Sequence, residues 1–452
     1  PRTPRPSCPP SRAGHLLLSR ARRPRRAPRL PRRQADPTCN DAHSGGAVPT
    51  SALKPLERVA FIAETHPSTV ALLQTLWRIG ATACPISPRL PAIEPALAQL
   101  DAHWLVDPNT LACTRIRHAP LMPVPVATLL FTSGSSGQPK IAAHTLEHYQ
   151  ESARAANSRI PLHPDDAWLL SLPLFHVGGL GILFRCQEAG CAFTLSPEEA
   201  THLSLVPTQL YRLTSPPPRA KILLIGGAPL SSTLFAKAQH LPLATTYGMT
   251  EMCSQIATNP APTSDMSCGT ALPHAEIALA KDGEILVRGK SLFLGYWDKE
   301  RGLTLPLTDE GWFATKDLGC FNAKDELIVT GRKDNLFISG GENIQPEEIE
   351  NALLLLPGIL DAIVVPRSDA EFGARPVAFI THTDTSFDEK NIQEALRPYL
   401  PKYKIPTQVL PFPCAKPGLK WNRKQLITFL HRTAERAALQ DPEGTPLNPH
   451  HG

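Results

Sequence analysis

The first 35 residues contain no aspartate or glutamate, although they contain eleven arginines. The first acidic residue is Asp36, and the chain after residue 35 has 35 basic and 41 acidic residues. The formal net charge of +5 therefore reflects the first segment, because the rest of the chain is mildly acidic. A mildly acidic body gives no net electrostatic reason to bind nucleic acid.

The chain also lacks zinc-type cysteine spacing and long apolar runs. Its ten cysteines form no CxxC pair, and no His/Cys cluster has zinc spacing. Scattered cysteines are typical of a reducing compartment, so we expect a cytoplasmic protein. The longest apolar stretch, 168–184, is interrupted by Pro173, His176 and three glycines, so it predicts buried core and no membrane span.

Residues 1–50 are rich in arginine and proline and have no periodic pattern that could bury a core. We expect this segment to be disordered. Three interpretations stay open for it. It could be a targeting peptide, since such peptides are Arg-rich and acid-poor; it could be a nucleic-acid-binding arm; or it could be a non-native segment.

A globular pattern begins at Leu56. Residues 58–64 predict a buried strand, and 68–80 predict an amphipathic helix that ends on its last glycine. Further strands are predicted at 127–131, 167–173 and 221–227. Because these strands alternate with helices, they imply a largely parallel sheet with helices on both faces. The later sequence KDGEILVRG, with its DG turn, predicts an antiparallel hairpin.

The predicted fold class is α/β, with a large N-terminal domain of helix-flanked sheets and a small β subdomain over 51–331. A small α+β domain follows over 332–440, and 441–452 are expected to form a tail. Helices of the small domain are predicted near 346–356, 388–399 and 423–439.

The strongest motif is FTSGSSGQPK, residues 131–140, directly after a predicted strand. Glycines and hydroxyl residues let backbone N–H groups surround phosphate oxygens, and Lys140 adds a positive charge. The spacing differs from a Walker A loop, and a flexible Ser/Gly turn is the alternative. The predicted phosphate-binding residues of this loop are Thr132, Ser133, Gly134, Ser135, Ser136, Gly137 and Lys140.

Together with this loop, three later segments resemble the signatures of the adenylate-forming superfamily, which holds acyl-CoA synthetases, peptide-synthetase adenylation domains and luciferases. The segments are TTYGMTE at 245–251, GWFATKDLG at 311–319 and GRKDNLFISGGENIQPEEIE at 331–350. The resemblance implies an ATP- and Mg²⁺-dependent enzyme that activates a carboxylic acid as an acyl-adenylate. It also implies transfer of the acyl group to coenzyme A.

The resemblance assigns roles that suit the chemistry of each residue. Glu251 would bind Mg²⁺ on the triphosphate, with a surface acid as the alternative, and Thr250 would bond the α-phosphate. Asp317 would accept both ribose hydroxyls, and Arg332 would bond them from the domain boundary. Lys316 stands where the family usually has glycine, so we expect a small backbone difference there. The other expected nucleotide contacts are Gly226, Gly227, Ala228, Tyr247 and Gly248, of which the first three could instead be a simple tight turn.

In this family a lysine near the C-terminus lies on the acyl carboxylate and the α-phosphate. We predict that Lys420 has this role, because Trp421 and Arg423 fit the residues expected after it. Lys416 and Lys424 are the alternatives.

The family then rotates its small, mobile domain about a hinge, expected here at Lys333 and Asp334. The rotation replaces the lysine with a loop that lines the coenzyme A channel, expected here at Gly340 and Gly341.

Three segments, 171–185, 204–213 and 340–350, closely resemble the o-succinylbenzoate–CoA ligases of menaquinone synthesis. Their substrate, 2-succinylbenzoate, is a dianion, so its spectator carboxylate needs a fixed cation. We predict Arg212 as that anchor, with Arg185 as the alternative; an exposed helix arginine is the non-functional interpretation of Arg212. His176 is expected at the gate of the acyl pocket, with a role in catalysis, and a core histidine bonded to backbone is its alternative.

The expected partners are 2-succinylbenzoate, ATP and coenzyme A, without nucleic acid, and a homo-oligomer stays open. Family members have strands and helices before the region around Val59, so the resemblance implies an uncovered apolar face in this domain. The alternative functions are another aryl- or acyl-CoA ligase or, less favoured, an Arg-rich nucleic-acid-binding protein with an inactive adenylation module. The complete set of Lys140, Glu251, Asp317, Arg332 and Lys420 argues against inactivity.

Overall fold

The computed structural model describes residues 50–132, 139–213, 215–228, 230, 232–383, 388–413 and 421–439, all of which belong to one compact unit. The predicted disorder of 1–50 concerns residues that lie almost entirely outside this described part. Among the described residues, no helix combines the length and the apolar character needed to cross a bilayer.

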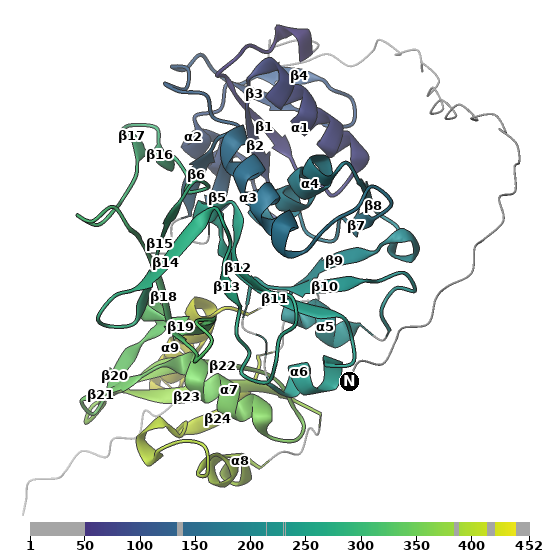
Figure 1. Cartoon of the computed structure of the whole chain (residues 1–452). Coiled ribbons are helices and arrows are strands. Elements are labelled where there is room, and N and C mark those ends of the chain that lie inside the picture. Colours follow the sequence, from purple (N-terminus) through teal and green to yellow (C-terminus); the bar gives the residue numbers. More distant parts are fainter. Residues whose placement is uncertain are drawn as a thin grey trace, which may run out of the picture. The chain divides into compact units, whose positions relative to one another are not determined.

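Within the described residues, one sheet has eight strands and is parallel at its centre (Figure 1). The central strand β1 pairs in parallel with β2 and β3, and β2 pairs in parallel with β5. Antiparallel strands complete both sides. In spatial order the strands are β17 (Gly302–Thr304), β16 (Gly295–Asp298), β6 (Lys140–His144), β5 (Thr128–Thr132), β2 (Thr82–Ile86), β1 (Arg58–Ile62), β3 (Trp104–Val106) and β4 (Cys113–Arg115).

A second sheet has seven strands in the described residues, parallel from β8 to β11 and antiparallel beyond. Its order is β13 (Thr270–Ala271), β12 (Ser254–Asn259), β11 (Leu243–Met249), β10 (Ile222–Ile225), β9 (His202–Leu205), β7 (Ala167–Leu169) and β8 (Ala192–Thr194). The strands predicted at 58–64, 127–131 and 221–227 are confirmed. The strand predicted at 167–173 ends at Leu169, because the chain turns there and the Ser171 N–H donates to the Leu169 carbonyl. The strand–helix alternation predicted a largely parallel arrangement, and in the described residues both of these sheets combine parallel strands with antiparallel ones.

Helices α1 (Pro67–Ile79), α3 (Leu146–Arg159) and α4 (Val177–Ala189) share one apolar core with strands of both sheets. Residues alternate across β1: Val59 and Phe61 pack into this core, whereas Ala60 packs toward α2 (Glu94–Leu100) on the other face. Helix α1 ends at Gly80, as predicted, because this glycine adopts φ 73° and its N–H caps the last turn. Helices α5 (Pro207–Arg212) and α6 (Ser232–Ala238) pack on the second sheet.

The predicted hairpin is present in an antiparallel sheet that has four strands in the described part of the chain. Its strands are β14 (Ala275–Leu279), β15 (Glu284–Gly289), β18 (Phe313–Phe321) and β19 (Leu327–Arg332). Strands β18 and β19 bring the GWFATKDLG segment alongside the start of 331–350.

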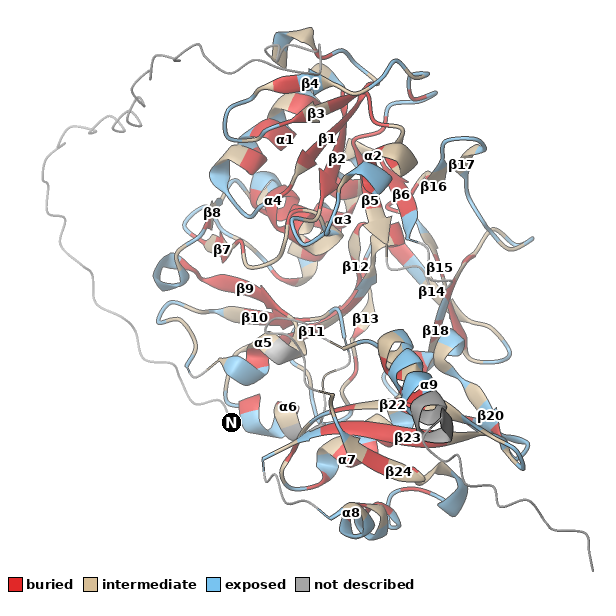
Figure 2. Ribbon diagram, turned by 180° about the vertical axis from the view of Figure 1, so that it is seen from behind, coloured by how far each residue is buried: buried red, intermediate tan, exposed pale blue. Residues whose placement is uncertain are grey.

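The last part of the chain is a smaller α+β arrangement around β22 (Ile359–Asp369), β23 (Gly373–His382) and β24 (Gln408–Pro411). Its buried strand residues alternate in direction: Val364 packs with α7 (Pro346–Leu355) and α8 (Glu389–Leu396), whereas Val365 packs with α9 (Arg423–Leu439) (Figure 2). The three predicted helices are confirmed. A hairpin of β20 (Phe337–Ser339) and β21 (Glu342–Ile344) precedes them.

Candidate active site

The two ends of the phosphate motif lie directly opposite each other. Thr132 ends β5 and Lys140 begins β6, and these two residues are partners in the antiparallel register. The loop residues Ser133, Gly134, Ser135, Ser136 and Gly137 lie outside the described residues. The predicted loop therefore connects two neighbouring, hydrogen-bonded strands, which fixes both of its ends.

Glu251 lies in a 3₁₀ turn, Thr250–Met252, directly after β11. Its side chain is only 8% exposed, and its Oε1 accepts a hydrogen bond of 2.6 Å from the Tyr296 hydroxyl. The alternative of a surface acid is therefore wrong. Among the described residues no basic side chain forms an ion pair with Glu251, so this nearly buried carboxylate is suited to a cation from outside the chain.

The backbone of this turn is held by a buried histidine. His144, the last residue of β6, donates from Nε2 to the Thr250 carbonyl at 2.7 Å, so the ring is the Nε2–H tautomer. Burial lowers the pKa of His144 to about 3, which keeps the ring neutral at physiological pH. The turn that carries Thr250 is thus tied to the same strand that begins with Lys140.

Two of the glycines expected to contact the nucleotide lie directly after strand β10, and a third lies within β11. Gly226 and Gly227 come directly after β10, and a Cβ on Gly226 would lie 2.7 Å from a Thr246 methyl on β11. Ala228, next to them, is exposed. At Gly248 a Cβ would lie 1.9 Å from the Ser254 carbonyl oxygen, so only glycine allows β11 and β12 to pair there.

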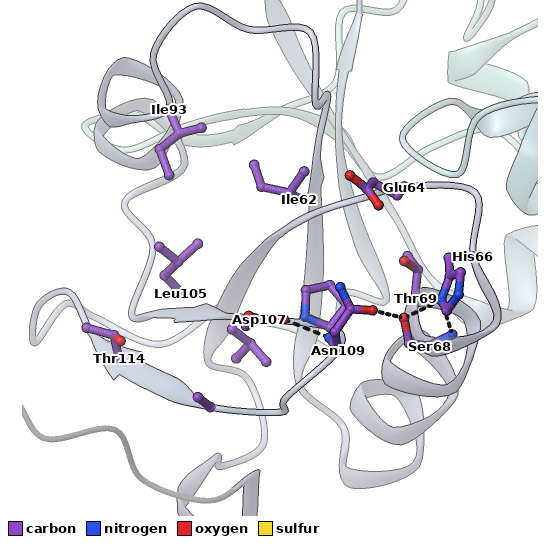
Figure 3. Close-up of a pocket in the computed structure, with 13 residues that line it drawn as sticks. Ile62, Glu64, His66, Ser68, Thr69, Ile93, Leu105, Asp107, Asn109 and Thr114 are labelled. Carbon is purple, nitrogen blue, oxygen red and sulfur yellow. Dashed lines mark hydrogen bonds between the residues drawn. The ribbon is translucent and has the colours of Figure 1, made fainter. Parts of the chain in front are cut away.

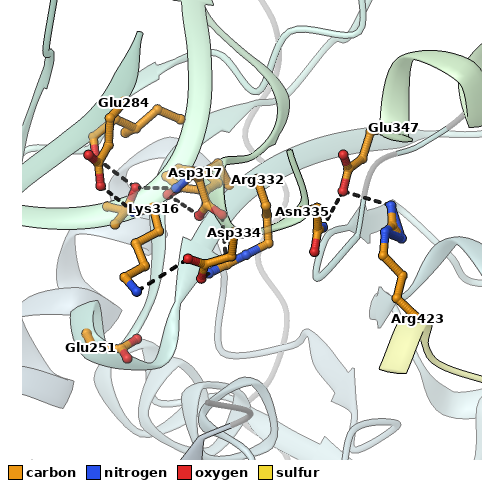
Figure 4. A network of polar contacts seen from close by, with 12 residues as sticks. Glu251, Glu284, Lys316, Asp317, Arg332, Asp334, Asn335, Glu347 and Arg423 are labelled. Carbon is orange, nitrogen blue, oxygen red and sulfur yellow. Dashed lines mark hydrogen bonds and ion pairs between the residues drawn. The ribbon is translucent and has the colours of Figure 1, made fainter. Parts of the chain in front are cut away.

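The carboxylate of Asp317 is held from two sides, and Figure 4 shows the side of Arg332. The Tyr247 hydroxyl donates to Oδ2 at 2.7 Å, and Arg332 donates to Oδ1 at 2.8 Å from the opposite strand. Burial raises the pKa of Asp317, and Arg332 opposes that effect. Three residues that we predicted separately for nucleotide binding therefore form one hydrogen-bonded group. Lys316, beside them, adopts φ 64°, a conformation that favours glycine, so the backbone is strained at this lysine.

The two predicted hinge residues form ion pairs with different partners. Lys333 contacts Asp282 and Glu284 of the β14–β15 hairpin at 2.6 and 2.9 Å, and these bonds raise the pKa of Lys333. Asp334 contacts Lys316 at 3.3 Å and Arg332 at 3.5 Å. A rotation about this segment would have to break or rearrange such contacts.

Gly340 and Gly341 form the two-residue turn between β20 and β21, with φ 58° and φ 85°. Positive φ at both positions is the requirement of a type I′ hairpin turn. A Cβ on Gly340 would lie 2.7 Å from the Phe372 ring, whereas space around Gly341 is open. The two glycines are thus explained structurally as well as by their predicted place in the coenzyme A channel.

The two candidate anchors for the spectator carboxylate differ in exposure. Arg212 is exposed at the end of α5. Arg185 is buried; it donates to Gln255 at 2.8 Å and Asn157 at 2.9 Å, and it lies 4.0 Å from the Trp168 ring centroid. Burial lowers the pKa of Arg185 to about 9, so it is still charged at neutral pH.

His176 precedes α4, and its side chain is exposed beside Phe175. The alternative interpretation of His176 as a core histidine is therefore wrong. Lys420 and the alternative Lys416 lie outside the described residues, whereas Lys424 lies in the first turn of α9. Its neighbour Arg423 pairs with Glu347 and Glu350 within the small domain.

A cavity of about 420 Å³ lies elsewhere, near the ends of β1 and β3 (Figure 3). Its lining includes Glu64, His66, Ser68, Asp107 and Asn109, and none of the predicted site residues. The motifs of this chain therefore do not point to this cavity.

Sequence reasoning missed Tyr296 and His144, which contact the YGMTE turn. Neither belongs to a segment that resembles a family signature. The only sequence signal was that each lies in a short, mostly apolar stretch, which equally describes core residues.

Mg²⁺ usually binds through one or two carboxylates together with substrate phosphates. The nearly buried Glu251 fits that arrangement. Tyr296 contacts both Glu251 and Lys140, so the carboxylate lies near the end of the predicted phosphate loop. The described residues contain no cluster of three or more His, Cys, Asp or Glu side chains that could hold a metal without a nucleotide.

Comparisons with known proteins identify the family of this chain. Two family models match: AMP-binding enzyme over 96–297, and AMP-binding enzyme C-terminal domain over 348–413. A 2-succinylbenzoate–CoA ligase of Salmonella typhimurium is 37% identical, over 80% of this chain and 85% of that enzyme. A solved E. coli MenE variant with bound OSB-AMS has a TM-score of 0.74 and 33% identity, over 85% of this chain and 90% of that one. A Bacillus subtilis MenE in complex with ATP and magnesium has a TM-score of 0.72 and 26% identity, over 83% and 90%.

The chain belongs to the AMP-binding enzymes, the adenylate-forming superfamily. Within that superfamily it is an acyl-CoA ligase, an acid–thiol ligase that forms an acyl-adenylate. The predicted fold class, a large α/β domain followed by a small α+β domain, is confirmed.

Proposed function

We propose that this enzyme ligates 2-succinylbenzoate to coenzyme A through an acyl-adenylate, giving 2-succinylbenzoyl-CoA, AMP and pyrophosphate in menaquinone biosynthesis. The observation that carries the choice of acid is the 37% identity to a ligase of that name over most of both chains. The three substrate-region segments, 171–185, 204–213 and 340–350, support the same choice.

In the first half-reaction the acyl carboxylate attacks the α-phosphorus of ATP, and pyrophosphate leaves. Two anions must meet, so the barrier is largely electrostatic. Bound Mg²⁺, held by Glu251, would neutralise phosphate charge. Lys140 places a cation at the end of the phosphate loop, Thr250 offers a hydroxyl to the α-phosphate, and Lys420 approaches the reacting oxygens.

Asp317 and Arg332 hold the ribose in this proposal. Their present bond of 2.8 Å gives Asp317 a fixed orientation, and its carboxylate can accept both ribose hydroxyls. Rotation about Lys333 and Asp334 then removes Lys420 and brings Gly340 and Gly341 to the acyl carbonyl for attack by the thiol.

The test is pyrophosphate release by the purified chain across a panel of acids, with and without coenzyme A. We expect Mg²⁺-dependent release with 2-succinylbenzoate and poor release with benzoate, succinate and fatty acids. Preference for a fatty acid would overturn the substrate and leave the reaction class intact. Preference for another aromatic acid would make the enzyme a different aryl-CoA ligase.

Arg212→Ala is expected to raise KM for 2-succinylbenzoate by about 10–100-fold, with a smaller effect on kcat. Loss of a charge-assisted hydrogen bond costs roughly 1.5–3 kcal/mol, which corresponds to this range. Steady-state kinetics with varied acid measures it.

The matched control is Arg219→Ala, which removes another exposed arginine a short distance along the chain. An unchanged KM in Arg212→Ala would transfer the role to Arg185. In that case Arg185→Lys would test the role of Arg185, because lysine keeps the positive charge but loses the planar guanidinium that binds a carboxylate through two hydrogen bonds.

A further inference from the structure

Tyr296 contacts both charged groups of the proposed phosphate site. Its hydroxyl donates to Glu251 Oε1 at 2.6 Å, and its ring centroid lies 4.4 Å from Lys140 Nζ. The hydroxyl bond to an ionised carboxylate is short and charge-assisted, and an ammonium over an aromatic ring is attracted by the ring's electron density. One side chain therefore connects the end of the phosphate loop with the YGMTE turn.

The pairing of β16 with β6 places Tyr296 at this point. Tyr296 lies directly opposite Ala142, and Lys140 lies two residues before Ala142 on the same face of β6. Side chains two residues apart share a face of a strand, so Lys140 is the diagonal neighbour of Tyr296. The contact with Lys140 is thus set by sheet register.

A second contact holds the backbone of Glu251. The Phe293 N–H donates to the Glu251 carbonyl at 2.8 Å, and the Phe293 ring packs edge-on against the Tyr296 ring at 4.8 Å. Residues 293–296 therefore hold both the main chain and the side chain of Glu251. Because Phe293 is fully buried, these contacts belong to the packed core.

We propose that Tyr296 is a positioning residue of the adenylation reaction: it fixes the rotation of the Glu251 carboxylate for metal binding and holds the Lys140 side chain at the start of β6. The inference rests on the proposed function. Losing the hydroxyl frees the carboxylate to rotate, and losing the ring also frees the lysine.

The two contacts are separated by two substitutions. Tyr296→Phe keeps the ring and removes the hydroxyl, whereas Tyr296→Leu removes both. We expect Tyr296→Phe to raise the Kd for Mn²⁺ about tenfold in the presence of a non-hydrolysable ATP analogue, measured by electron paramagnetic resonance. Its affinity for the analogue in EDTA should be unchanged. Tyr296→Leu, by contrast, should weaken analogue binding in EDTA by about two- to fivefold, because Lys140 is released.

The matched control is Tyr149→Phe, which also loses a buried hydroxyl bond, to Thr128 at 2.8 Å, but does not contact Glu251. It should retain wild-type Mn²⁺ affinity, with thermal melts showing that all variants are folded. In the Glu251→Gln background, removing the Tyr296 hydroxyl should have no further effect on Mn²⁺ affinity.

Wild-type Mn²⁺ affinity in Tyr296→Phe would overturn the inference, as would an equal loss in Tyr149→Phe. These outcomes differ from failure of the proposed function. In that case the unaltered chain would neither bind Mn²⁺ with the analogue nor release pyrophosphate with 2-succinylbenzoate.

Discussion

Lys420→Ala is expected to lower acyl-adenylate formation by about 10²–10³-fold, the usual effect of removing one preorganised charge-stabilising group. The lysine neutralises charge at the α-phosphate and has no role once the adenylate exists. The variant should therefore still convert chemically made acyl-adenylate and coenzyme A into thioester. Single-turnover assays of each half-reaction measure the two effects separately.

The same assays on Lys416→Ala and Lys424→Ala serve as controls, since these are the other lysines of the segment. An equal loss of both half-reactions in Lys420→Ala would contradict an adenylation-specific role. Selective loss of adenylation in Lys416→Ala or Lys424→Ala would instead identify that lysine as the catalytic one.

A side chain at Gly341 is expected to have the reverse effect. Gly341→Leu should form adenylate and then stall, but φ 85° at this position is strained for leucine. Gly341→Asn is the sharper variant, because asparagine tolerates this conformation and suits a type I′ turn. We expect thioester formation to fall by about 10²-fold, the scale of misplacing a reacting group, with adenylation nearly unchanged.

Gly302→Asn is the matched control for this variant. Gly302 has φ 74° and open space around it, and it lies on β17. Its substitution should spare both half-reactions. If Gly341→Asn forms thioester at the wild-type rate, the turn is needed only for the hairpin and the proposed coenzyme A channel lies elsewhere.

The elements that the sequence predicted well have local causes. The helix at 67–79 ends where Gly80 can adopt a left-handed conformation, and the hairpin near Gly283 follows from its DG turn. The extent of β7 and the division into two sheets were not predictable in this way. They depend on which strands pair, and pairing partners such as β6 and β16 are far apart in the sequence.

The residues of the candidate site fall into the same two groups, those with local causes and those placed by tertiary contacts. Lys140, Glu251, Asp317 and Arg332 could be named from sequence because each lies in a short motif whose backbone geometry is local. The contacts of Tyr296 and His144 could not, because they depend on strand register and on a turn more than 100 residues from His144. The burial of Arg185 and the exposure of Arg212 were likewise invisible, since exposure depends on what packs over a residue. The superfamily, the motif residues and most of the helices could be identified from the amino-acid sequence. The side chains that hold those motifs in place could be identified only in three dimensions, because hydrogen bonds across a sheet join residues that no sequence pattern links.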